Sequence, residues 1–137
     1  MKPVSDLNKL KQENQKYVEE FVDSLEGLSP KTISQHQLNA ELFLHYLAEY
    51  EGETPEEGVD SLGVFMTDFF TRKCMWSSPA TMKSTAASIK KLYTFLAKQG
   101  YVSQEAAQIV KETIKEDLEY WCDCVESYDN GAWGSFF

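Results

Sequence analysis

Apolar side chains recur every three or four residues along most of this chain, which is the spacing that predicts amphipathic α-helices. Five segments follow the pattern: about 5–25, 30–50, 61–74, 79–100 and 104–128. No run of alternating apolar and polar residues is long enough to predict a strand. The sequence therefore predicts an all-α fold, a compact bundle of about five helices that forms one domain over residues 1–137.

Local signals mark where these helices begin and end. Ser29–Pro30 and Ser78–Pro79 each offer a serine N-cap followed by proline at the first helical position, where the missing N–H would have had no partner. Gly27, Gly52 and Gly100 stand where helices are expected to stop. The boundaries are therefore predicted from residue type as well as from periodicity.

The helix expected at 79–100 has two different faces when its residues are projected at about 100° each. One arc is apolar and predicted to lie in the core: Met82, Thr85, Ala86, Ile89, Leu92, Tyr93 and Leu96. The other is small or cationic: Lys83, Ala87, Lys90, Lys91, Thr94 and Lys98. The helix at 30–50 has an apolar face that contains one histidine: Ile33, His36, Ala40, Phe43, Tyr46, Leu47 and Tyr50.

Composition narrows the class of protein. With 42% hydrophobic and 26% charged residues, the chain reads as globular. It has neither an apolar stretch of membrane-spanning length nor an apolar signal core near its start, so we expect a cytoplasmic protein with no membrane partner. Its three cysteines are expected to be free thiols. The Cys122–Cys124 pair lacks the second ligand pair typical of zinc sites, so no metal or other cofactor is predicted.

Charge is distributed unevenly. The formal net charge is −9, yet residues 69–104 hold six basic residues and no carboxylate. A protein that binds nucleic acid through bulk charge is usually basic overall, so the global balance argues against that function. The acid-free segment argues for it. A solvated face of a core helix is the alternative explanation of the lysines, but it does not explain why acids are missing there.

The order and spacing of these helices resemble the N-terminal core-binding domain of tyrosine recombinases (phage integrases), a SAM-like helical bundle. The resemblance covers about residues 17–110 and is carried by "YVEEFVDSLEGLSPKTISQHQLNAELFLHYL" and "SSPATMKSTAASIKKLYTFLAKQGYVS". It implies a SAM-like subtype of the all-α fold. The long acidic helix at about 104–128 and the short aromatic tail at 129–137 lie largely outside it.

In that family the domain lays the starts of its second and fourth helices against double-stranded DNA. Carried over by position, the resemblance implies these DNA-facing residues: Lys31, Thr32, Gln35, Lys83, Ser84, Ala87, Lys90 and Lys91. Relatives often have a basic pair where this chain has Gln37 and Leu38, and an arginine where it has Ser84, so we expect weak, largely electrostatic binding. His36 takes a position where relatives often have tyrosine. It is expected to be a core or backbone-bonded histidine, with a phosphate contact as the alternative.

The sequence predicts no catalytic site. Recombinase chemistry attacks a phosphodiester with a tyrosine while cationic groups stabilise the transition state, and relatives supply at least two arginines for this from a separate domain. This chain has one arginine, Arg72, and carries none of the common phosphate-loop, metalloprotease or nucleophile-elbow motifs.

Three interpretations therefore remain open. The first is a non-catalytic DNA-binding domain that acts beside a recombinase or descends from one. The second is an acidic protein-interaction module that binds a tyrosine recombinase or itself, through the helix at 104–128 and the aromatics Trp133, Phe136 and Phe137. The third is a product of a truncated integrase gene.

Overall fold

The computed structural model of the chain describes residues 4–74 and 77–129, and within these ranges every regular element is a helix. This confirms the predicted all-α bundle. The SAM-like subtype stays a prediction. In chain order the elements are α1 (Val4–Asp23), α2 (Pro30–Tyr46), η1 (Leu47–Glu51), η2 (Glu57–Ser61), α3 (Leu62–Val64), η3 (Phe65–Phe70), α4 (Thr71–Lys73), α5 (Pro79–Lys98) and α6 (Gln104–Asp129).

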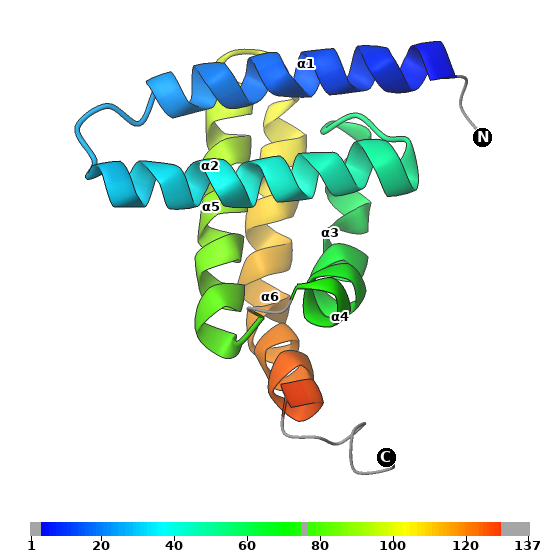
Figure 1. Cartoon of the computed structure of the whole chain (residues 1–137), viewed down its shortest axis with the longest axis vertical. Helices are drawn as coiled ribbons and strands as arrows, with labels where there is room; N and C mark the ends of the chain where they lie inside the picture. The colour runs from blue at the N-terminus through cyan, green and yellow to red at the C-terminus, as the bar shows by residue number, and fades with distance from the viewer. Residues whose placement is uncertain (1–3, 75–76, 130–137) are drawn as a thin grey trace.

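The long helices form two antiparallel pairs (Figure 1). α1 and α2 lie side by side, and this pair crosses the end of the α5–α6 pair where α5 finishes and α6 begins. The short helices α3 and α4 lie beside α6, while the C-terminal end of α6 extends away from α1. α2 therefore contacts α1 along one edge and α5 along another.

The predicted starts of α2 and α5 are confirmed. The Ser29 hydroxyl accepts from the Thr32 N–H at 3.2 Å, and Pro30 follows at the first helical position. Ser78 forms a reciprocal capping box, in which its hydroxyl accepts from the backbone N–H of Thr81 and its own N–H donates to the threonine hydroxyl. Such caps satisfy N–H groups that have no partner within the helix.

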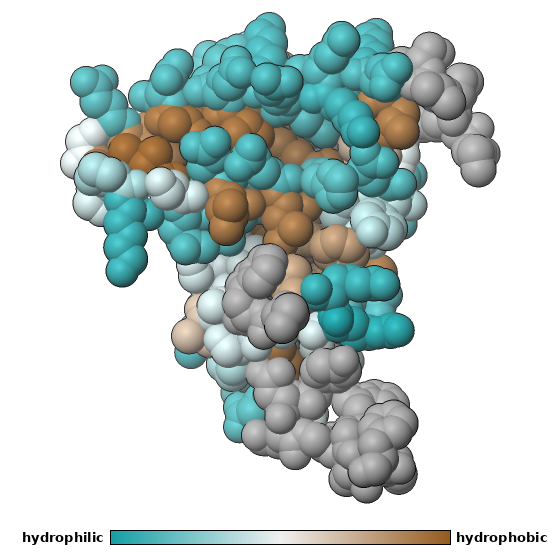
Figure 2. Space-filling model, in the orientation of Figure 1, coloured by the Kyte–Doolittle hydropathy of each residue, from teal (hydrophilic) through white to brown (hydrophobic). Residues whose placement is uncertain are grey.

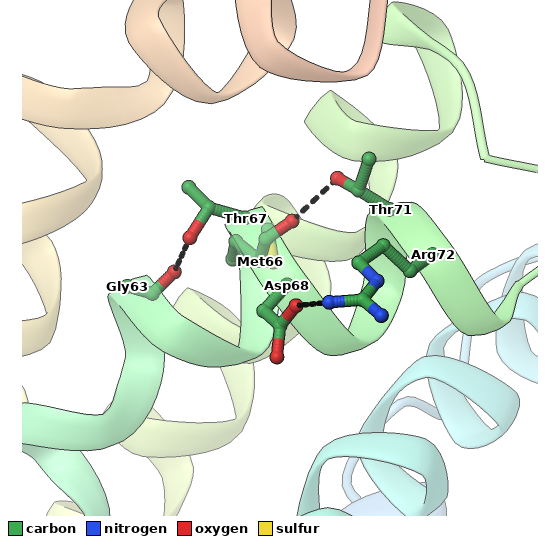
Figure 3. Close-up of polar contacts among 6 residues, drawn as sticks. All are labelled: Gly63, Met66, Thr67, Asp68, Thr71 and Arg72. Atoms are coloured by element: carbon green, nitrogen blue, oxygen red, sulfur yellow. Dashed lines mark hydrogen bonds and ion pairs between the residues drawn. The ribbon is translucent and has the colours of Figure 1, made fainter. Parts of the chain in front are cut away.

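The helix predicted at Ser61–Cys74 is not one regular α-helix. The 3₁₀ turn η2 ends at its first residue, and the segment then divides into the short α3, the π-helical turn η3 and the short α4. Phe65 and Phe70, at the two ends of η3, are both fully buried in the core. Figure 3 shows the accompanying contact, in which the Thr71 hydroxyl donates to the Met66 carbonyl at 2.9 Å.

The core lies where α2, α5 and α6 meet the short helices. All seven residues predicted for the buried arc of α5 are buried, and every residue of its opposite arc is exposed. Tyr50 belongs to the apolar face that periodicity predicts for the second helix, but it is 58% exposed. The π-helical turn η1 changes the spacing after Tyr46, and the Tyr50 ring lies at the edge of the core, stacked on Tyr46 and edge-on to Phe69. On the face of the molecule seen in Figure 2, apolar residues gather in a band between α1 and α2.

Candidate nucleic-acid interface

The exposed face of α5 carries the lysines that the sequence singled out. Lys83, Lys90 and Lys91 are exposed, Ala87 is exposed beside them, and Ser84 is half-buried. Within the described ranges, no carboxylate lies within ion-pair distance of these three lysines. None of the three charges is therefore neutralised by an ion pair within these ranges.

The start of α2 contributes the other predicted residues, Lys31, Thr32 and Gln35, all of which are exposed. The Thr32 hydroxyl accepts from the Ser29 hydroxyl at 2.8 Å, so Thr32 is part of the helix cap. The Gln35 side chain donates to Asn39 Oδ1 at 3.3 Å, which holds it along the helix toward the contact with α5. Lys31 makes no ion pair among the described residues.

A polar network joins the two halves of this surface. Ser88, on the inner side of α5, is 0% exposed. Its hydroxyl accepts from Asn39 Nδ2 at 2.9 Å, lies 2.7 Å from His36 Nδ1, and donates to the Ser84 carbonyl at 3.1 Å. These bonds hold α2 and α5 in one register, and they connect Gln35 to the stretch of α5 around Ser84.

His36 is half-buried and bonded to a side-chain hydroxyl, whereas the sequence favoured a core or backbone-bonded histidine. Its ring meets that of Phe21 edge-on, with the centroids 6.5 Å apart. Burial lowers the pKa of His36, and the nearby charge of Lys91 lowers it further. The histidine therefore favours its neutral form, and Lys91 lies on the side of α5 that faces α2.

The cationic residues of α5 do not form one continuous ridge. At about 100° per residue, Lys83 and Lys90 lie within about 20° of each other, while Lys91 lies about 100° from Lys90. Lys83 is close to Cys122 on α6: burial raises the pKa of this thiol, while the charge of Lys83 opposes the rise. One cationic edge of α5 therefore faces α2 and the other faces α6.

The α6 edge has mixed charge. The carboxylates of Glu119, Asp123 and Glu126 act on the same thiol as Lys83, and each of them raises its pKa. Lys83 therefore stands near several negative charges, although it forms no ion pair in the described structure. Lys91 lies near His36, a residue that favours its neutral form, and so has the more favourable surroundings for a phosphate.

Arg72 lies within the acid-free segment of the sequence, but an ion pair offsets its charge. Its Nη1 lies 2.9 Å from Oδ1 of Asp68, the residue just before that segment (Figure 3). The positive charge of the segment is thus carried by its lysines.

The cysteines do not assemble a metal site among the residues that the structure describes, since no group of three or more His, Cys, Asp or Glu there could hold an ion. Cys122 and Cys124 are two residues apart on a helix and so point about 160° apart around its axis. Cys122 is buried, with its thiol 3.7 Å from the Pro79 carbonyl, and Cys124 is half-buried. The aromatic tail proposed for partner binding lies outside the described residues beyond Asp129.

Sequence reasoning missed Ser88 and Asn39. The signal was present, because both are polar positions on otherwise apolar helix faces, and Asn39 follows His36 by three residues, one helical turn away. The sequence did not indicate that α2 and α5 place these two side chains against each other. The free cationic face and the buried network beneath its α2 edge together make up the candidate interface.

No helix in the described ranges is both long and apolar enough to span a membrane. No protein-family model, curated protein or solved structure matches the chain. The resemblance to recombinase core-binding domains therefore rests on the sequence features alone.

Proposed function

We propose that this chain binds double-stranded DNA through the start of α2 and the exposed face of α5, as a non-catalytic domain related to the DNA-binding arm of tyrosine recombinases. The observation that carries the proposal is a set of exposed lysines, Lys31, Lys90 and Lys91, that make no ion pair among the described residues of an otherwise acidic protein. Lysines in such surroundings are free to contact phosphates.

Hydrogen bonds between α2 and α5 beneath the surface also support the proposal. The His36–Ser88–Asn39 network holds α2 and α5 together, so their cationic residues keep a constant relative placement. A surface that is already ordered loses less conformational entropy when it binds. Gln35 and Ser84, both linked to the network, add hydrogen-bonding groups that suit the phosphate backbone.

The net charge of −9 limits affinity, because the rest of the surface repels the duplex. Binding is therefore weak and strongly dependent on salt. With about four phosphate contacts, the slope of log K against log salt concentration would be on the order of −3 to −4.

The proposed function has no chemical step. The only arginine in the sequence, Arg72, is held by Asp68, and the chain contains only two histidines. The transition state of phosphodiester cleavage needs several convergent cationic groups. In this proposal, any strand exchange is carried out by a partner recombinase.

Fluorescence anisotropy with a labelled duplex at low salt tests the proposal. The double variant Lys90→Glu/Lys91→Glu should bind about tenfold more weakly or worse, and the magnitude of its salt slope should decrease by about one per lysine. The single variant Lys115→Glu, at an exposed position on α6, is the control and should bind like the wild type. Equal affinity for all three proteins, or a slope near zero, would refute DNA binding by this face.

The two cationic edges of α5 can be compared in the same assay. Lys91→Ala should weaken binding more than Lys83→Ala does, because the carboxylates of α6 already offset the charge of Lys83. A larger loss of affinity in Lys83→Ala than in Lys91→Ala would indicate that the duplex lies against the α6 edge of α5 and not against α2.

A further inference from the structure

A groove of about 600 Å³ lies between α1 and α2. Its floor is apolar and consists of Val18 and Val22 from α1 with Leu44 from α2 and Ala48 from η1. This part of the molecule contributes to the apolar band that Figure 2 shows between the two helices. A hollow with an apolar floor between two antiparallel helices has the shape that receives a third helix.

The rim of the groove is acidic toward one end. Glu19 and Asp23 line it from α1, and Glu41 lines it from α2. Asp23 and Glu41 make no ion pair among the described residues, and Glu19 accepts only a neutral hydrogen bond, from Gln15 at 3.2 Å.

Two basic side chains line the groove toward its other end. The ammonium of Lys11 is paired with Glu49, and His45 lines the groove from α2. The groove therefore presents an apolar floor with carboxylates concentrated toward the end where α1 finishes.

The groove also contains an unused acceptor. Asn14 is 7% exposed and lines the groove, and its Nδ2 donates to the Leu44 carbonyl at 3.3 Å. Its Oδ1 is buried and has no hydrogen-bond partner in the described structure. The contact between α1 and α2 beside the groove therefore leaves one buried polar atom unsatisfied.

We propose that this groove binds an amphipathic α-helix of a partner protein, with the apolar stripe of that helix on the floor and its lysine or arginine side chains over Glu19, Asp23 and Glu41. From Lys11 to Asp23 the helix rise is about 18 Å, so a partner helix of about three turns fills the groove. Complementary charge fixes the direction in which it lies.

The groove and most of the proposed DNA surface lie on different sides of α2. At about 100° per residue, Thr32 lies about 180° and Gln35 about 120° from Glu41 around the helix axis, whereas Lys31 lies about 80° from it. No lysine of α5 is among the residues that line the groove. Charge reversal at Glu19 and Glu41 therefore tests the groove without changing a residue of the proposed DNA surface.

Synthetic helical peptides test the inference against the full-length chain. Three peptides share one length: the first has a leucine stripe flanked by lysines, the second has the same stripe flanked by glutamates, and the third has the lysines with serine in place of leucine. Binding is followed by amide chemical shifts. The first peptide should perturb residues of α1 and α2 around the groove, and the other two should bind about tenfold more weakly.

Charge reversal in the protein provides the matched test. Glu19→Lys/Glu41→Lys should weaken binding of the lysine peptide and strengthen binding of the glutamate peptide. Glu105→Lys/Glu116→Lys, which makes the same charge change at exposed sites on α6, should leave the preference as in the wild type.

Several outcomes would overturn the proposal: no perturbation at the groove, equal affinity for the lysine and glutamate peptides, or perturbations confined to α6. A concentration-dependent dimer in sedimentation, lost in Glu19→Lys/Glu41→Lys, would also overturn it, because a second copy of the chain would then occupy the groove.

Discussion

The Nδ1 atom of His36 lies 2.7 Å from the Ser88 hydroxyl, which joins α2 to α5 across 52 positions of sequence. That hydroxyl has one proton, which it donates to the Ser84 carbonyl. Its oxygen is then an acceptor both for the Asn39 amide and for His36. With the hydroxyl proton given to the Ser84 carbonyl, we predict that neutral His36 carries its proton on Nδ1.

Nitrogen NMR of the histidine rings measures this directly. Above the pKa of His36, we expect its Nδ1 to be protonated and its Nε2 bare. The Ser88→Ala variant removes the acceptor, and it should both relax this preference and lower the free energy of unfolding by about 1–3 kcal/mol, because it leaves buried polar groups unpaired. A proton found on Nε2 in the wild type would contradict the assigned direction of the bond.

The stability of the fold should depend on pH through the same residue. Because burial, and then Lys91, lower the pKa of His36 in the folded state, the unfolded chain binds the proton more readily. The contribution of His36 is therefore fully present above about pH 6.5 and is lost as pH falls through the lowered folded-state value.

Urea unfolding between about pH 7 and pH 5 tests this dependence. The loss of stability should be smaller in His36→Gln, which has no group that titrates in this range. Lys91→Gln should raise the pKa of His36 toward its ordinary value and reduce the loss. Identical pH profiles for the wild type and His36→Gln would show that the histidine is not linked to folding.

The ion pair between Arg72 and Asp68 should contribute little to stability. Both side chains are more than half exposed, and exposed pairs of this kind usually contribute less than about 1 kcal/mol. Arg72→Ala should therefore change the free energy of unfolding by less than about 0.5 kcal/mol in urea titrations. It should also reduce DNA affinity less than Lys91→Ala does, since Asp68 already offsets the charge of Arg72.

Gly58 stands where a side chain has no room. A Cβ atom at this position would come within 2.5 Å of both methyl groups of Leu47, which is 0% exposed. Gly58→Ala should therefore destabilise the fold by about 1–3 kcal/mol in chemical denaturation, because the core has to shift.

Gly63 offers a matched control within the same helical region. A Cβ atom there meets nothing within 4 Å, and its backbone is helical. Gly63→Ala should be neutral or should stabilise the protein by up to about 1 kcal/mol, the usual difference in helix propensity. A loss of stability in Gly63→Ala as large as that in Gly58→Ala would mean that steric conflict with Leu47 is not the cause.

Local sequence predicted the long helices well. Ser29 and Ser78 cap α2 and α5 as expected, and Gly52 and Gly100 follow their helical segments with φ of 64° and 81°. Such signals can be read without a structure because caps and stops depend on residues within one turn of each other. The two faces of α5 followed from periodicity for the same reason.

Predictions from the spacing of apolar residues were wrong where the helix changes from α to π geometry. Tyr50 and the segment from Ser61 to Cys74 were placed by a constant α-helical period, but η1 and η3 are π-helical turns. Such turns are rare and occur as single turns within helices. The spacing of the apolar residues in these segments fits an α-helix as well, so it does not indicate where a π-turn occurs.

The sequence by itself determined where the long helices begin and end, and which face of each is apolar or cationic, because these properties depend on residues a few positions apart. Only the tertiary structure decided that Lys91 faces α2 while Lys83 lies near the acids of α6, that Ser88 joins His36 to Asn39, and that α1 and α2 leave a groove open between them. The physical reason is distance along the chain. Each of these relationships depends on how separate helices pack against one another, and helix periodicity carries no information about that packing.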